Sequence, residues 1–70
     1  MRIITVHDPS KRRHAYQMIR VDDSASGEDM QRAILATLYP GKRLRLQHSH
    51  HEFPWEILRA GRHTLAVRVS

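Results

Sequence analysis

Residues 26–41, SGEDMQRAILATLYPG, form the stretch that decides the fold class of this chain. Ser26 is a residue type that caps helix N-termini, and the two acidic residues at 28 and 29 suit the positive end of a helix dipole. One stripe of side chains then follows the helical spacing i, i+3, i+4, i+7 and i+8, at Met30, Ala33, Ile34, Thr37 and Leu38. Because a Pro-Gly pair ends the pattern, the stretch predicts a helix over residues 27–39 that lies on a sheet.

Two strand patterns precede this helix. Residues 2–7 are mostly apolar and β-branched, and Asp8-Pro9-Ser10 then supplies residue types that are typical of turns. Residues 15–21 predict a second strand, with Gln17, Ile19 and Val21 on one face and Tyr16, Met18 and Arg20 on the other. The two segments predict a hairpin, although the adjacent Ile3 and Ile4 leave open which face of the first strand is buried.

Two further strand patterns follow the helix. Residues 42–47 alternate, with Leu44 and Leu46 on one face, and residues 64–69 alternate again, with Leu65, Val67 and Val69 inward. Between them we expect a loop at 48–54, a short strand or one helical turn at 55–58, and a turn at 60–62. The chain therefore predicts an α+β fold of β-β-α-β-β order.

This order resembles the ubiquitin-like β-grasp fold. There are three points of resemblance: the N-terminal start Met1-Arg2-Ile3, the helix that follows Val21-Asp22-Asp23-Ser24, and the final strand His63-Thr64-Leu65-Ala66-Val67-Arg68-Val69. The resemblance implies a mixed sheet with one helix on one face, adjacent and parallel first and last strands, and a protein-binding or adaptor role. The chain departs from the family at Arg68-Val69-Ser70, where conjugated members carry a Gly-Gly tail, so neither conjugation nor sulfur transfer is expected.

Length and composition narrow the function classes. Seventy residues predict a single domain over 1–70 with one modest core, so we expect neither an enzyme nor a bound cofactor. The absence of cysteine excludes disulfides, Cys-ligated zinc and thiol catalysis. The longest apolar run is Ala33-Ile34-Leu35-Ala36, and the N-terminus lacks the apolar stretch of a signal peptide. We therefore expect a soluble, cytoplasmic protein that does not associate with membranes.

The charge balance favours an acidic partner. The chain has twelve basic side chains, ten of them arginine, and seven acidic ones, which gives a formal net charge of +5. The guanidinium group binds carboxylates and phosphates through two hydrogen bonds at once, which suits an acidic protein or a nucleic acid. Codon usage in a GC-rich genome is the competing explanation of the arginine excess.

Three groups of residues are candidates for partner binding. In the expected fold, Arg43, Arg45 and Arg68 share the sheet face opposite the helix, and the alternative is an ordinary solvated face. The second group is Lys11, Arg12 and Arg13 in the first hairpin connection, where a solvated turn is the competing interpretation. The third is Trp55, which with Phe53, Ile57 and Leu58 either closes the core or forms an exposed hot spot.

A histidine-rich run offers metal ligands. His48, His50 and His51, followed by Glu52, carry the imidazole and carboxylate donors that zinc, nickel and copper accept. Because dedicated sites usually draw their ligands from separated segments, we expect no dedicated metal site here but a polar loop that takes up metal only adventitiously. The alternative is a site built from two or three of these imidazoles with a carboxylate.

Together these observations predict a small, basic, non-enzymatic protein-binding module that occupies an acidic partner surface. Such a module acts as an adaptor, a subunit or an inhibitor, for example one that a phage or mobile element directs at a host factor. The alternative is a nucleic-acid-binding protein that uses the same arginines and the first hairpin loop, with few aromatic residues for base stacking. The oligomeric state stays open, because an exposed sheet edge can pair with a second copy.

Overall fold

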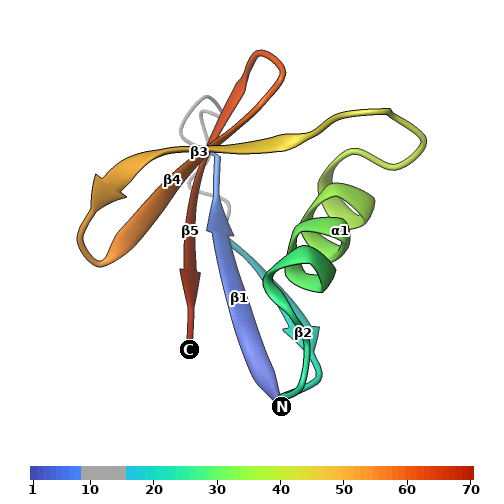
Figure 1. Cartoon of the computed structure of the whole chain (residues 1–70), viewed down its shortest axis with the longest axis vertical. Helices are drawn as coiled ribbons and strands as arrows, with labels where there is room; N and C mark the ends of the chain where they lie inside the picture. The colour runs from blue at the N-terminus through green and yellow to red at the C-terminus, as the bar shows by residue number, and fades with distance from the viewer. Residues whose placement is uncertain (9–15) are drawn as a thin grey trace.

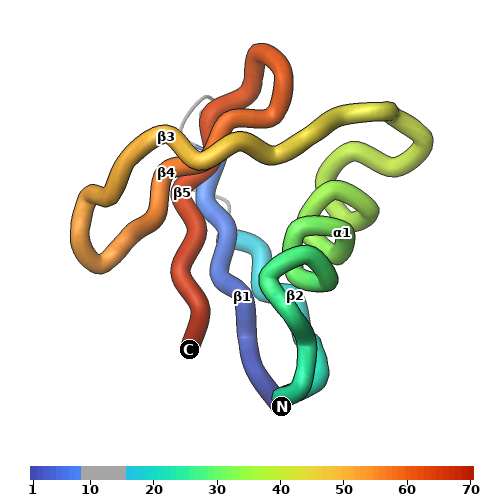
Figure 2. Tube along the Cα trace, viewed as in Figure 1, coloured from blue at the N-terminus to red at the C-terminus, as the bar shows by residue number. Residues whose placement is uncertain are grey.

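The computed structural model describes residues 1–8 and 16–70 (Figures 1 and 2). Its elements are β1 (Arg2–His7), β2 (Tyr16–Val21), α1 (Gly27–Leu38), β3 (Leu46–Glu52), β4 (Trp55–Ala60) and β5 (His63–Val69). The α+β class, the helix and the strands predicted at 2–7, 15–21 and 64–69 are confirmed to within one residue at each described end. Most of the connection between β1 and β2, including Pro9 and Ser10 of the predicted turn, lies outside the described residues.

The five strands form one antiparallel sheet in the order β2-β1-β5-β4-β3. The first and last strands are neighbours, as expected. They run antiparallel, with Ile4 opposite Val69 and His7 opposite Ala66, so the expected parallel pairing and mixed sheet are wrong. The reason is β4. It is a full strand between β3 and β5 rather than a short irregular element, and it reverses the chain once more before β5 begins.

The helix begins at a complete capping box. The Ser26 hydroxyl accepts a hydrogen bond from the Asp29 backbone N–H at 3.1 Å, and the Asp29 carboxylate accepts one from the Ser26 N–H at 3.1 Å. Of the predicted stripe, Ile34 is buried and Met30, Ala33 and Leu38 are half-buried, whereas Thr37 is exposed. The stripe is therefore confirmed except at its polar member.

The core lies between α1 and one face of the sheet. Its buried members are Ile4, Val6, Ile19, Ile34, Leu58, Leu65 and Val67. Ile4 is fully buried in this core and Ile3 is only half-buried, which settles the orientation of β1. The helix covers β1 and β2, while β3 and β4 extend away from it (Figure 1). Most apolar side chains of β4 and β5 on this face are nevertheless buried, whereas His48 and His51 of the edge strand β3 stay exposed.

The segment between the helix and β5 differs most from its prediction. The strand expected at 42–47 begins only at Leu46, and the expected loop at 48–54 is mostly strand β3. The polar residues of β3 form a strand because their backbone groups pair with those of β4, while the edge position of β3 leaves their side chains in solvent. Only Phe53 and Pro54 of the expected loop remain as the turn between β3 and β4, and a cis peptide bond joins them. The next turn is confirmed at residues 61–62, where Gly61 has a φ of 60° that favours glycine.

The aromatic and apolar group around Trp55 divides between core and surface. Ile57 and Leu58 are buried, Trp55 is half-buried, and Phe53 is 98% exposed at the hairpin tip. The expectation that this group closes the core is therefore wrong for Phe53. The physical reason is the hairpin itself, because its turn projects beyond the sheet.

Candidate functional site

The sheet face opposite α1, here called the back face, carries large exposed side chains. Side chains alternate between faces, so the residues between the core positions of each strand point away from the helix. The cross-strand register aligns Tyr16, His7, Ala66 and Ile57 in one row across four strands. The back face also includes Met18, Arg20, Trp55, Arg59 and Arg68.

Three rings form an aromatic row on this face. The His7 and Tyr16 rings stack with centroids 4.7 Å apart, and the Tyr16 and Trp55 rings stack at 6.1 Å. These separations suit offset aromatic stacking. Tyr16 of β2 therefore contacts one ring from β1 and one from β4. Tyr16 remains 54% exposed, so part of the row is open to a partner.

Arginines surround the aromatic row. The Arg68 guanidinium carbon lies 5.0 Å from the centroid of the Trp55 ring, within the range of a cation–π contact. Arg20 and Arg59 are exposed on the same face. Within residues 1–8 and 16–70, the ion pairs involve none of these three arginines. The back face therefore combines exposed rings with available positive charge.

The structure does not bring together the three arginines predicted to form one patch. Arg43 and Arg45 are exposed but precede β3, because that strand begins at Leu46. Leu46 is opposite Ala60 at one end of β4, whereas Arg68 lies over Trp55 at the other end. The expected compact Arg43–Arg45–Arg68 patch is therefore wrong, and Arg68 instead belongs to the back face. The predicted Lys11, Arg12 and Arg13 site lies outside the described residues.

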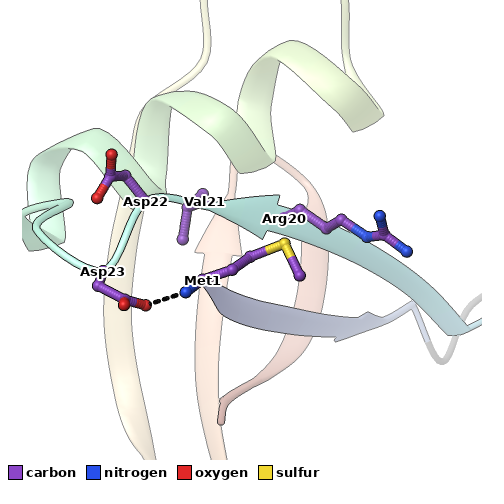
Figure 3. Close-up of a pocket in the computed structure, with 5 residues that line it drawn as sticks. All are labelled: Met1, Arg20, Val21, Asp22 and Asp23. Atoms are coloured by element: carbon purple, nitrogen blue, oxygen red, sulfur yellow. Dashed lines mark ion pairs between the residues drawn. The ribbon is translucent and has the colours of Figure 1, made fainter.

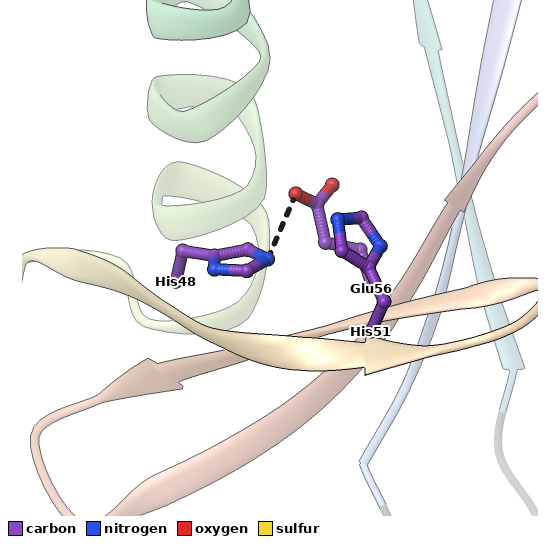
Figure 4. Close-up of side chains that lie close together, drawn as sticks. All are labelled: His48, His51 and Glu56. Atoms are coloured by element: carbon purple, nitrogen blue, oxygen red, sulfur yellow. Dashed lines mark ion pairs between the residues drawn. The ribbon is translucent and has the colours of Figure 1, made fainter.

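The histidine run is divided between the two faces of the sheet. The His48 and His51 side chains point with that of Glu56 toward the side of the sheet where α1 lies (Figure 4). His48 Nε2 is 3.4 Å from Glu56 Oε1, and the two imidazole rings are 4.9 Å apart. His50 is on the back face, where Nε2 is 2.9 Å from Glu52 Oε1 and Nδ1 is 2.9 Å from Ser49 Oγ.

A β-bulge causes this division. The register shifts between His48, opposite Leu58, and His50, opposite Ile57, so one extra residue enters β3. In a regular strand His48 and His50 would share a face. With the extra residue, His48 and His51 share one instead. The structure therefore separates His50 from the other two candidate histidines. Sequence reasoning missed Glu56 because it did not foresee a β3–β4 hairpin.

A shallow hollow at the N-terminus contains mainly groups that stabilise the local chain. It is lined by Met1, Arg20, Val21, Asp22 and Asp23, and the N-terminal ammonium group pairs with Asp23 (Figure 3). The Ser24 backbone N–H and hydroxyl both donate to Asp22 Oδ1 at 3.1 Å. These hydrogen bonds, the backbone one foremost, lower the pKa of Asp22. The acidic residues here therefore make contacts within the turn and with the N-terminus.

Comparison with known proteins finds no family model, no curated protein and no solved structure that matches this chain. Across the described residues, α1 is the longest helix, and it is too short to cross a membrane. The assignment of a function therefore depends on the surfaces described above.

Proposed function

We propose that the chain is a small, basic, non-enzymatic protein-binding module whose back face engages an acidic surface of a partner protein. The observation that carries this proposal is the contact between Arg68, Trp55 and Tyr16 on an exposed sheet face. Trp, Tyr and Arg are the residue types that most often dominate the binding energy of protein–protein interfaces. Here all three occur in one contiguous group.

Charge on the back face supports an acidic partner. Three arginines, Arg20, Arg59 and Arg68, are exposed on this face. The carboxylate of Glu52 lies at the β3 edge and contacts His50. A guanidinium group can donate two parallel hydrogen bonds to one carboxylate. Aspartate and glutamate side chains of a partner would therefore supply both charge complementarity and a defined geometry.

The cluster is also held in place before a partner arrives. Arg68 lies against Trp55, and Trp55 stacks on Tyr16, so each long side chain has a neighbour that restricts its rotamers. Side chains that are already ordered lose less conformational entropy on binding. This preorganisation suits an adaptor, a subunit or an inhibitor, and the proposal rests on the surface rather than on the β-grasp resemblance.

The same observation favours a second candidate, a single-stranded nucleic acid. Proteins that bind single strands combine positive charge with exposed rings on which bases stack. The back face offers both. The ring surface available for stacking bases is small, however, because His7 and Trp55 are half-buried. We therefore rank a protein partner first.

A charge-reversal comparison tests the proposal. The wild-type chain, Arg68→Glu and Arg62→Glu are immobilised and exposed to nuclease-treated lysate of the source cell, and each retained protein is purified for calorimetry. Arg62 is the matched control, because it is exposed in the β4–β5 turn and its reversal changes the charge equally. Circular dichroism confirms that both variants fold.

We expect an acidic protein that binds the wild type and the Arg62→Glu variant with similar affinity. Arg68→Glu should weaken that affinity about 30-fold, as expected for a hot-spot contact of about 2 kcal/mol. Equal loss in both variants would show non-specific charge attraction and refute the back-face proposal. Tight binding of oligothymidine, with a log–log salt slope of about −2 for three phosphate contacts, would establish the nucleic-acid alternative instead.

A further inference from the structure

The hairpin of β3 and β4 brings three metal-ligating side chains together on the side of the sheet that faces α1. His48 and His51 come from β3, and Glu56 comes from β4 (Figure 4). One donor atom from each side chain lies within 4.8 Å of the other two. The cluster is independent of the back face, since it lies on the opposite side of the sheet.

The distances fit a tetrahedral ion after a small adjustment. Zinc bound to nitrogen and oxygen at about 2.0–2.1 Å places neighbouring tetrahedral ligands about 3.3 Å apart. His48 Nε2 and Glu56 Oε1 are already 3.4 Å apart. The largest separation among the three donor atoms is at most 4.8 Å. Side-chain rotations that move a donor atom by about 1.5 Å would therefore bring all three to tetrahedral spacing.

The backbone fixes the positions of these ligands. His51 and Glu56 are cross-strand partners in the β3–β4 ladder, and His48 is opposite Leu58, two residues along β4 from Glu56. The β-bulge supplies the extra residue that places His48 and His51 on one face. The ligands therefore come from two hydrogen-bonded strands, which orient them better than a flexible loop would.

The surroundings differ on the two sides of the cluster. His48 and Glu56 line a groove of about 220 Å³ between α1 and the sheet, whose other walls include Met30, Ile34 and Val67. Side-chain exposure is 46% for both His48 and Glu56, so an ion can enter from solvent. An apolar wall limits water on one side of a bound ion, which strengthens its interaction with charged ligands.

We propose that His48, His51 and Glu56 bind one divalent transition-metal ion of the zinc type. Two imidazoles and one carboxylate are a ligand set that zinc adopts, and three protein ligands leave a fourth position for water or for a donor group of a ligand. His50 takes no part, because it lies on the other face and contacts Glu52 and Ser49.

The test titrates zinc chloride into the full chain by isothermal calorimetry. It compares the wild type with His51→Asn, Glu56→Gln and His50→Asn. His50→Asn is the matched control, because it removes an exposed histidine of the same strand from the opposite face. We expect one ion per wild-type chain with a Kd below about 100 µM. Loss of a ligand should weaken binding at least about tenfold, and the control should change it less than about twofold.

Thermal unfolding provides a second readout. A zinc concentration about 100-fold above Kd should raise the Tm of the wild type and of His50→Asn by about 10 °C or more, and the Tm of the ligand variants much less. Absence of one-to-one binding by the wild type would overturn the proposal. Equal weakening by His50→Asn and His51→Asn would also overturn it, because it would show adventitious chelation by the histidine run.

Discussion

The contact between Arg68 and Trp55 leads to a quantitative prediction about the back face. The guanidinium carbon is 5.0 Å from the ring centroid, and Arg68 is exposed. A cation–π contact at an exposed site contributes about 0.5–1 kcal/mol. We therefore expect a double-mutant cycle of Trp55→Leu and Arg68→Gln to give a favourable coupling of that size in the free energy of unfolding.

Urea unfolding of the wild type, both single variants and the double variant measures this coupling. Arg59→Gln, combined with Trp55→Leu, is the control, because Arg59 loses the same charge from the same face without a cation–π contact among the described residues. For a domain of this size the coupling corresponds to about 2–8 °C in Tm. A coupling near zero, or one equal to that of the Arg59 cycle, would refute the preorganised cluster and remove the main support for the proposed binding face.

Three further predictions concern the stability of the fold. Ser26→Ala should lower the free energy of unfolding by about 1 kcal/mol, because it removes the hydroxyl that accepts from the Asp29 backbone; urea unfolding checks this, and an unchanged midpoint would contradict it. The pKa of Asp29 is lowered by hydrogen bonds from the Ser26 backbone and hydroxyl, with a smaller contribution from Arg32. Its stabilising effect is therefore present above the unfolded-state pKa of about 3.9 and is lost as pH falls through the lower folded-state value. Thermal melts between about pH 6 and pH 2 should show a smaller decrease in Tm for Asp29→Asn than for the wild type. Finally, the Tyr39 hydroxyl is buried without a hydrogen-bond partner among residues 1–8 and 16–70, and burial, followed by the charge of Asp8, raises its pKa. Tyr39→Phe should leave the free energy of unfolding unchanged or raise it by up to about 1 kcal/mol, and destabilisation by more than that in urea would refute this interpretation.

The sequence by itself determined the elements that depend on neighbouring residues. The helix is the clearest case, since Ser26 and Asp29 cap it through contacts three residues apart and Ile34 lies on its apolar stripe. The strands at 2–7 and 64–69 follow equally from local apolar patterns. These features depend on spacings of two to four residues, which can be identified before any tertiary contact is known.

The tertiary structure decided which distant residues meet. It placed Arg43 and Arg45 before β3, directed Arg68 onto Trp55, and divided the histidine run between two faces. The polar β3 segment has no apolar alternation of its own and becomes a strand only because β4 offers backbone partners. Strand direction, register and bulges depend on pairing across the sheet, and a shift of one residue moves every side chain to the other face. That physical dependence explains why both the aromatic row and the His48–His51–Glu56 cluster emerge only from the folded chain.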